Sequence, residues 1–362
     1  MIRTHTEWGK LEEVIVGREL EIPYRVMDTT FKVFYANNIK HNQFHEYEEY
    51  KISAELIQER VEDLDGLSEI LENLGVKVLR PDQVTQSISV KTPEFKSLVS
   101  SASNVRDLTL TYRDMIIETP PLIRGRYFEN RNMHKIFKKH FFEGSKWIKS
   151  PDVLLTNDSI DDEEWDVEWD FVNINYSKWD LGIDAAQYLK LGKDIFCNIS
   201  TYNHFLGAKW MSQVLGPDVN IHMIESMIDN HMDGNILPLK PGVFLVNESC
   251  LKKPIKEYLP KKFHSWKFIN SDNGEVRQKN YDTYFTPFVQ LCSYRGMDMN
   301  VLSIDENTVL VNDDAHNTIS VLEKNGFTVV PVKLRHCELF GGGIHCSTLD
   351  TVRKDEFIDY TW

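Results

Sequence analysis

The sequence lacks the features that place a chain in a membrane, in the secretory pathway or on nucleic acid. No apolar run approaches the roughly 18 residues of a membrane span, and residues 1–17, MIRTHTEWGKLEEVIVG, contain no apolar core of a signal peptide. The formal net charge is −14, and no run of five or more basic residues occurs. We therefore expect a cytoplasmic protein that binds neither nucleic acid nor a membrane.

Cysteine is scarce and scattered, and no CxxC pair occurs among Cys197, Cys250, Cys292, Cys337 and Cys346. An odd number of separated cysteines argues against a disulfide framework and against structural zinc, and predicts reduced thiols. The glycine-rich GxGxxG and P-loop patterns are also absent, so the chain carries no fingerprint of a nucleotide cofactor.

A repeated pattern is present instead, in which an amphipathic helix is followed by a turn and an apolar strand. In the clearest copy, LSEILENLGVKVLRPD at 67–82, apolar residues recur at helical spacing, Gly75 ends the helix, and Val-Lys-Val-Leu follows. Three further copies lie at 133–152, 208–225 and 319–334, with Gly144 and Asn325-Gly326 as stops in two of them. In a fifth copy, at 255–270, Pro260 shortens the helix.

Strand-like segments precede the copies at 11–17, 108–118, 193–200, 242–248 and 299–313. The unit is therefore strand-strand-helix-strand, present five times. Such units cannot bury their apolar faces alone and must pack around a shared core. We predict an α/β fold in which five units close into a pseudo-fivefold propeller, as one catalytic domain over 1–362; the alternative is an ordinary α/β sandwich.

Polar residues occupy the boundaries between these units. Asp107, Asp184 and the neighbours His231 and Asp233 each precede a unit, and Cys346 follows a triple-glycine stretch where the ring would close. If corresponding positions face one axis, these five side chains converge in one pocket.

The chemistry of that set suits attack on a planar cation. A thiolate at Cys346 needs a base, which His231 supplies, and Asp184 behind it would orient the imidazole. Asp107 and Asp233 are surplus for acyl transfer, but paired carboxylates bind a guanidinium well. We expect the three glycines to let the backbone approach the substrate.

Taken singly, each residue also fits a structural role. Cys346 could be a buried thiol, and His231 with Asp233 could be a capping pair. Asp107 could be a helix cap or form an ion pair with Arg106, and Asp184 could begin a helix. Three other histidines, at His204, His222 and His345, show no such partner pattern, and we predict that they are structural. No pair of them has the spacing of a zinc site.

The stretch RHCELFGGGIHCSTLD at 335–350 resembles the nucleophile segment of the amidinotransferases, which include glycine and inosamine-phosphate amidinotransferases within the guanidine-modifying pentein group. Segments at 106–131, 183–196, 203–211 and 231–247 resemble family segments in the family's order. The resemblance implies a five-bladed α/β propeller, no metal, no organic cofactor and a covalent amidino-cysteine intermediate.

The resemblance also implies a role for each residue at the unit boundaries. Cys346 is the nucleophile, His231 the general acid and base, and Asp184 its partner, while Asp107 and Asp233 hold the guanidinium.

Further substrate contacts follow from the same resemblance. Ser293 falls near a family serine that binds the amino-acid end of the donor. Asn230 stands where glycine amidinotransferase has a methionine, which suggests a differently shaped acceptor pocket. The family arginine that grips the substrate carboxylate has no clear equivalent, and Lys252 or Lys253 stands near its place.

We therefore predict an L-arginine:amine amidinotransferase that works by a ping-pong route and has small molecules as partners, with a homodimer as its assembly. Lysine is the preferred acceptor, giving homoarginine and ornithine, and glycine or a specialised-metabolite amine is the alternative. A deiminase-like hydrolase that forms citrulline and a non-catalytic arginine-binding protein are the rival functions.

Overall fold

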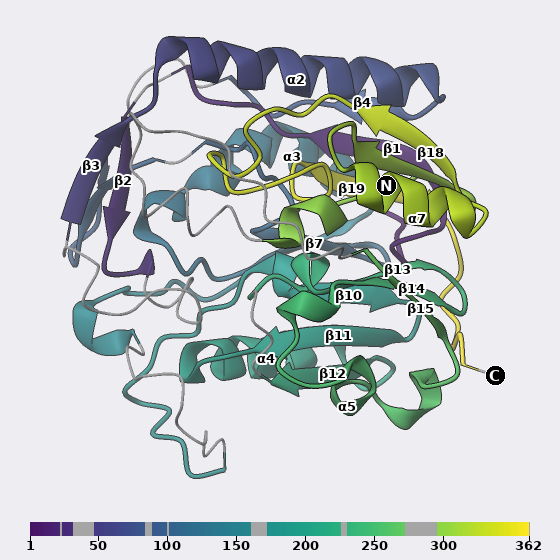
Figure 1. Cartoon of the computed structure of the whole chain (residues 1–362). Coiled ribbons are helices and arrows are strands. Elements are labelled where there is room, and N and C mark those ends of the chain that lie inside the picture. The colour runs from purple at the N-terminus through teal and green to yellow at the C-terminus, as the bar shows by residue number, and fades with distance from the viewer. Residues whose placement is uncertain are drawn as a thin grey trace.

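The computed structural model describes residues 1–21, 24–31, 47–83, 89–99, 101–160, 172–225, 230–271 and 295–361 of the chain. Within these residues the strands form five three-stranded sheets and two smaller hairpins (Figure 1). In every three-stranded sheet, the middle strand is antiparallel to one neighbour and parallel to the other.

One unit shows how the sequence pattern becomes a sheet. Strands β7 (Thr109–Tyr112) and β8 (Met115–Glu118) form a hairpin, helix α3 (His134–Phe142) follows, and β9 (Lys146–Lys149) returns parallel to β8. Every residue of β7 and β8 is buried. Complete burial is expected when both faces of a strand are covered, and here it includes the polar side chains of Thr109, Thr111 and Glu118.

The same order recurs in three further units. They are β10 (Tyr188–Leu191), β11 (Asp194–Ile199), α4 (Tyr202–Leu215) and β12 (Asn220–Glu225); β13 (Ile236–Lys240), β14 (Val243–Val246), α5 (Ile255–Tyr258) and β15 (Lys267–Asn270); and β16 (Leu302–Ser303), β17 (Thr308–Asn312), α7 (His316–Lys324) and β18 (Thr328–Val332).

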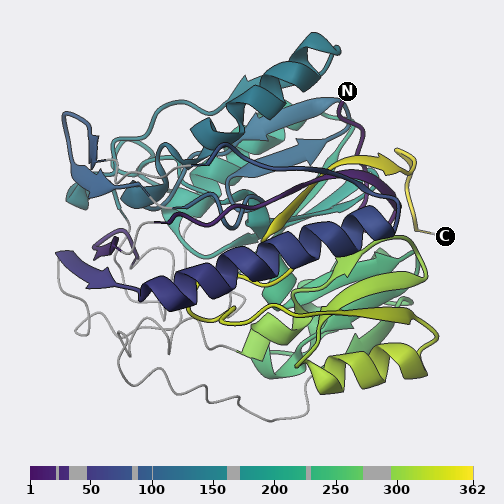
Figure 2. The same cartoon turned by 90° about the horizontal axis from the view of Figure 1, so that it is seen from above.

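The remaining sheet is assembled from both ends of the chain. Strand β1 (Lys10–Val16) is followed by α2 (Ala54–Asn73) and by β4 (Lys77–Leu79), which is parallel to β1. Its antiparallel partner is β19 (Thr348–Lys354), the last strand of the chain. Figure 1 shows α2 along the top edge of the molecule, and in Figure 2, seen from above, the same helix crosses the middle of the view.

The predicted helix ends are confirmed. Gly75, Gly144 and Gly326 have φ of +80°, +105° and +83°, a conformation that favours glycine over residues with a Cβ. Helix α5 has only 4 residues and ends at Tyr258, two positions before Pro260.

Helix α2 begins at Ala54, well before the start that the sequence pattern predicted. The pattern missed the first part of the helix because two charged residues interrupt its apolar face. Arg60 and Asp63 are both buried on this helix. Arg60 Nη2 donates to Ser347 Oγ at 2.8 Å, and Arg335 Nη2 lies 2.8 Å from Asp63 Oδ1. The tertiary partners make these polar positions part of the buried face.

Charged side chains join the inner strands of different units. Asp350 on β19 is fully buried and accepts hydrogen bonds from Lys190 Nζ at 2.6 Å, Arg106 Nη2 at 2.6 Å and Arg353 Nε at 3.0 Å. Glu7 accepts from Arg106 Nη1 at 3.3 Å. Buried charges are tolerated when they are paired and hydrogen-bonded, so these five residues, the inner ion cluster, tie β10, β19 and the segment before β7 together.

Two hairpins lie outside the repeat, formed by β2 (Tyr24–Asp28) with β3 (Tyr47–Lys51) and by β5 (Ser89–Lys91) with β6 (Lys96–Leu98). Among the described residues, no helix has both the length and the apolar character needed to cross a membrane.

Candidate active site

The structure brings the boundary residues of different units into one buried site. Atoms of Asp107, His231 and Cys346 lie within 4.8 Å of one another. Asp184 contacts the imidazole, and Asp233 contacts the thiol. All five side chains are buried, and their separation along the chain means that packing of the units assembles the site.

His231 is oriented by Asp184. Its Nε2 lies 3.1 Å from Asp184 Oδ2. Asp184 is also the N-cap of the short 3₁₀ helix Ala185–Gln187, and its backbone N–H donates to Gln187 Oε1 at 2.9 Å. The predicted helix start is therefore real, and the carboxylate of the same residue still faces the imidazole.

The contact with Asp184 defines the tautomer of His231. A carboxylate oxygen accepts a hydrogen bond, so Nε2 carries the proton and Nδ1 is the basic nitrogen of the neutral ring. Nδ1 lies 4.0 Å from Asp107 Oδ1. The nitrogen that can exchange a proton thus faces the side of the site that holds Asp107.

Cys346 is held by Asn300 and lies against an acidic neighbour. Its Sγ is 3.1 Å from Asn300 Nδ2 and 3.5 Å from Asp233 Oδ2. Burial raises the pKa of the Cys346 thiol well above its ordinary value, and the carboxylates of Asp233 and Asp107 add to the rise. In the site as it stands, Cys346 is therefore a neutral thiol.

Asp233 has its own histidine, and the prediction that His345 lacks an acidic partner is wrong. His345 Nδ1 lies 2.7 Å from Asp233 Oδ2, and its Nε2 lies 3.5 Å from Glu7 Oε2. Burial alone would raise the pKa of Asp233, but the hydrogen bond from His345 and nearby positive charge, including Arg106, hold it below its ordinary value. The sequence hid this pair because 112 positions separate the two residues.

Asp107 is paired with an arginine of the protein itself. Arg126 Nη1 lies 2.7 Å from Asp107 Oδ2, while Oδ1 has no hydrogen-bond partner among the described residues. Arg126 also makes a two-point contact with Glu129, at 2.7 and 2.8 Å. Burial raises the pKa of Asp107 and raises that of Glu129 to about 7, with Arg126 opposing both shifts.

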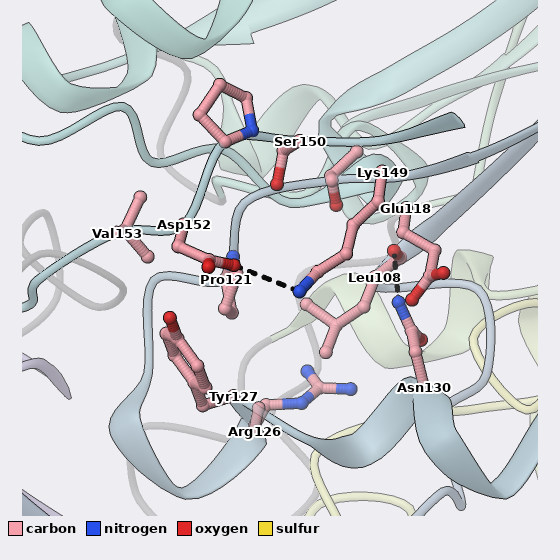
Figure 3. A pocket seen from close by; sticks show the side chains of 12 residues that line it. Leu108, Glu118, Pro121, Arg126, Tyr127, Asn130, Lys149, Ser150, Asp152 and Val153 are labelled. Carbon is pink, nitrogen blue, oxygen red and sulfur yellow. Dashed lines mark hydrogen bonds and ion pairs between the residues drawn. The ribbon is translucent and has the colours of Figure 1, made fainter. Parts of the chain in front are cut away.

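Arg126 also separates the site from a small pocket. Figure 3 shows the Arg126 guanidinium at this pocket, with Tyr127, Asn130, Lys149 and Asp152 around it. The pocket holds about 20 Å³, which is room for roughly one water molecule. Lys149 Nζ pairs with Asp152 at 3.0 Å, and the pocket is too small to hold an amino-acid substrate.

The glycine stretch makes room for asparagine side chains. A Cβ at Gly342 would lie 2.5 Å from Asn104 Oδ1, and one at Gly343 would lie 2.7 Å from Asn300 Cβ. Gly341 has a φ of +64°. The loop before Cys346 is therefore shaped to admit two asparagine side chains, and an approach of its backbone to a substrate stays a prediction.

The other predicted substrate contacts are placed only in part. Ser293 lies outside the described residues. Asn230 is buried, and its backbone oxygen accepts a hydrogen bond from Asn198 Nδ2 at 3.0 Å. Lys252 and Lys253 are exposed in the turn before α5.

A cysteine, a histidine and an aspartate at this distance are also a donor set that could hold a metal ion. The same three residues serve equally as nucleophile, base and substrate-binding acid. Comparison with known proteins identifies the family of the chain.

The fold gives the first step of that comparison. A dimethylarginine dimethylaminohydrolase superimposes with a TM-score of 0.57 at 12% identity, over 94% of this chain and 99% of that one, which shows that the two chains share a fold. An inosamine-phosphate amidinotransferase from Streptomyces griseus superimposes with a TM-score of 0.84 at 28% identity, over 100% and 99% of the two chains.

The sequence gives the second step. The chain is 30% identical to an L-arginine:L-lysine amidinotransferase of Pseudomonas savastanoi pv. phaseolicola, over 99% of this chain and 96% of the relative. It is 28% identical to the mitochondrial glycine amidinotransferase of Xenopus laevis, over 99% and 84%. No protein-family model matches the chain. The chain belongs to the amidinotransferase family, whose enzymes transfer amidino groups.

Proposed function

We propose that this enzyme moves the amidino group of L-arginine to an acceptor amine through a covalent intermediate on Cys346. The observation that carries the proposal is the convergence of Cys346, His231 and Asp107, with Asp184 on the far nitrogen of the imidazole. A nucleophile, a base and an orienting acid are the parts that covalent catalysis requires. No metal or organic cofactor has a part in this route.

The proposed architecture is a single catalytic domain in which the five units close a ring. Its support is the pairing of β19 with β1, which joins the last strand to the first. The inner ion cluster supplies links between units at the centre.

The donor guanidinium would bind between Asp107 and Asp233. Asp107 Oδ1 is a buried acceptor with no partner among the described residues, and Asp233 is kept ionised by His345. A guanidinium presents planar N–H donors that match such carboxylates. Its positive charge would offset the two carboxylates that raise the pKa of the thiol, so binding of the donor itself favours the thiolate.

In the first half-reaction, the Cys346 S–H bond breaks and the proton passes to His231 Nδ1. The thiolate attacks the central carbon of the guanidinium and forms a carbon–sulfur bond. The bond from that carbon to the δ-nitrogen of arginine then breaks, and His231 returns its proton to this nitrogen. Ornithine leaves, and the amidino group stays on sulfur.

In the second half-reaction, a neutral acceptor amine attacks the amidino carbon and gives a proton to His231. The carbon–sulfur bond breaks, His231 returns its proton to the sulfur, and the guanidino product leaves the restored thiol. One pocket therefore serves both substrates in turn, which is a ping-pong order. Water has to be excluded or badly oriented, since it would otherwise take the amidino group.

We propose lysine as the preferred acceptor, giving homoarginine. The support is the similarity to an arginine:lysine amidinotransferase, the asparagine at position 230 before His231, and the ability of a lysine side chain to use the channel of arginine. Glycine and specialised-metabolite amines are the alternatives, and Ser293 remains the candidate contact for the amino-acid end of the donor. A cytoplasmic location and a homodimeric assembly also stay predictions.

The test is to incubate the enzyme with L-arginine and a panel of amines and to read the products by mass spectrometry. We expect ornithine in every productive reaction, and homoarginine when lysine is supplied. Citrulline in place of ornithine would assign the enzyme to guanidine hydrolysis. Binding of arginine without any product, and without labelling of Cys346, would leave only a binding protein.

A further inference from the structure

Asn300 makes more contacts with the proposed nucleophile than any catalytic residue predicted from the sequence. It directly follows the 3₁₀ helix Arg295–Met299 and is buried. Its Nδ2 lies 3.1 Å from Cys346 Sγ and 3.0 Å from Asp233 Oδ2, and its Oδ1 accepts the Cys346 backbone N–H at 2.9 Å. Its backbone oxygen accepts the His345 N–H at 3.2 Å.

The partners of Asn300 fix which way its amide points. The backbone N–H of Cys346 is a donor, so it requires the carbonyl oxygen. The carboxylate of Asp233 accepts on the other side, so it requires the NH₂ group. In a flipped amide, Asn300 Oδ1 would face the Asp233 carboxylate oxygen, and Asn300 Nδ2 would face the Cys346 backbone N–H, so neither hydrogen bond could form. The N–H group is therefore directed at the sulfur.

The loop that carries Cys346 is built around this side chain. A Cβ at Gly343 would approach Asn300 Cβ to 2.7 Å and Asn300 Oδ1 to 2.9 Å. Glycine at this position thus allows Asn300 to reach both the backbone and the sulfur of Cys346.

Asn300 also differs in charge from the acidic neighbours of the sulfur. Asp233 and Asp107 are carboxylates, which disfavour a negative sulfur. A neutral amide donor at 3.1 Å favours it, because the N–H dipole points its positive end at the charge that develops.

We infer that Asn300 is a catalytic residue that holds the Cys346 thiolate, by donating its Nδ2–H to the sulfur once the thiol proton has passed to His231. The inference rests on the proposed role of Cys346 as nucleophile. Asn300 gains and loses no atom; it lowers the energy of the charged sulfur and aims it at the substrate carbon.

The test compares Asn300→Ser, whose shorter side chain removes the amide N–H that reaches the sulfur, and Asn300→Asp, which replaces the amide by a carboxylate, with the control Asn104→Ser. Asn104 holds the same loop from its other side, by donating to Phe340 O at 2.9 Å and Gly341 O at 3.2 Å. The control therefore loosens the loop without removing the donor that faces the sulfur.

The first readout is the rate of iodoacetamide alkylation at Cys346 between pH 7 and 10, followed by peptide mass mapping. Only the thiolate reacts, so a rise of one pKa unit slows alkylation about tenfold at every pH below the pKa. We expect at least this loss in Asn300→Ser, a larger loss in Asn300→Asp, and a change within about threefold in Asn104→Ser.

The second readout is single-turnover release of ornithine from arginine. We expect it to slow by about 10²–10³-fold in Asn300→Ser, the usual effect of removing a donor from a developing negative charge. An Asn300→Ser enzyme that folds by circular dichroism and keeps wild-type alkylation and release would overturn the inference. Loss of the fold in both Asn300 variants would also overturn it, because Asn300 would then be structural.

Failure of the proposed function has a different signature. If wild-type enzyme forms no adduct at Cys346 with arginine, or if Cys346→Ala still turns over, the nucleophile itself is misassigned. If the wild-type adduct forms and the Asn300 variants react normally, only the role of Asn300 is refuted.

Discussion

Arg126 Nη1 lies 2.7 Å from Asp107 Oδ2, so a guanidinium of the enzyme already occupies one oxygen of a carboxylate proposed to bind the guanidinium of the substrate. Two consequences follow from this pairing. Only Asp107 Oδ1 is available to the substrate, and Arg126 supports the ionised form of a carboxyl whose pKa is raised by burial.

We expect Arg126→Met to raise the KM for arginine by at least tenfold, a loss on the order of 1.4 kcal/mol. Without Arg126, the pKa of Asp107 rises further, and binding is lost as pH falls through that pKa because only the carboxylate binds the substrate. Measurement of KM between pH 5 and 9 should show the acid limb move to higher pH. Arg124→Met, which removes contacts with Leu155 O and Asn157 Oδ1 outside the site, is the matched control. An unmoved acid limb in Arg126→Met would contradict the role of Arg126.

Cys346→Ala should abolish turnover while arginine affinity stays within about an order of magnitude, because the carboxylates and not the thiol hold the guanidinium. Calorimetric titration of the variant with arginine measures the affinity. Cys337→Ala is the control, since the Cys337 thiol donates a hydrogen bond to Leu334 O and lies outside the site. Substantial turnover in Cys346→Ala would remove this residue from the mechanism.

Asp184→Asn removes the negative charge that faces His231 and keeps a residue that can cap the helix start. Asparagine caps helices as well as aspartate does, so the turn at Ala185–Gln187 should survive and the melting temperature should change little. The imidazole would lose its orienting charge, and we expect the rate to fall by about 10⁴-fold, as in serine proteases. Near-wild-type kcat would mean that Asp184 is a cap and nothing more.

Arginine alone should release up to one equivalent of ornithine per active site. The enzyme should gain the mass of one amidino group, and the adduct should map to the peptide that holds Cys346. Addition of the acceptor should discharge it, and initial-rate plots against arginine at several acceptor concentrations should be parallel. Intersecting lines, with no ornithine until acceptor is added, would indicate a ternary complex instead.

Glu7→Gln should destabilise the protein at pH 7 by about 3–5 kcal/mol, because it removes the partner of buried positive charges. Burial alone would raise the pKa of Glu7, but Lys190, His345 and Arg106 lower it from 4.5 to about 2. Because the folded-state pKa is depressed, this stabilisation is complete above pH 4.5 and is lost as pH falls toward 2.

Urea unfolding between pH 2 and 7 measures the effect, and the variant should show a weaker loss of stability in acid than the wild type. Glu12→Gln is the control, since Glu12 is an exposed partner of Arg3 and should contribute within about 0.5 kcal/mol. Equal pH dependence in wild type and Glu7→Gln would refute the assignment.

Local patterning was enough to predict the repeated unit. The helix-turn-strand copies carry their own periodicity, and the stops at Gly75, Gly144 and Gly326 need a positive φ that the local turn demands. Where a helix depended on distant partners, the pattern was incomplete: the predicted copy began at residue 67, whereas the helix begins at Ala54 and buries Arg60 and Asp63.

The five residues proposed for the chemistry were also visible in the sequence, since each stands at a boundary between units, and the structure brings all five together. One missed pair had a local signal, because Arg126 and Glu129 are spaced i, i+3 within a segment that resembles the family.

The sequence by itself determined the five units, their helix ends and the family, because these depend on local periodicity and on one continuous motif. Only the tertiary structure decided that Asn300 faces the Cys346 sulfur, that His345 serves Asp233, and that Arg126 occupies Asp107. Two of these pairs lie 46 and 112 positions apart, and a third joins a 3₁₀ helix to the start of a strand. The two long-range hydrogen bonds leave no periodic trace, because they are created by the packing of one unit against another, and the contact of Arg126 with Asp107 depends on how the loop after β8 folds back within its own unit.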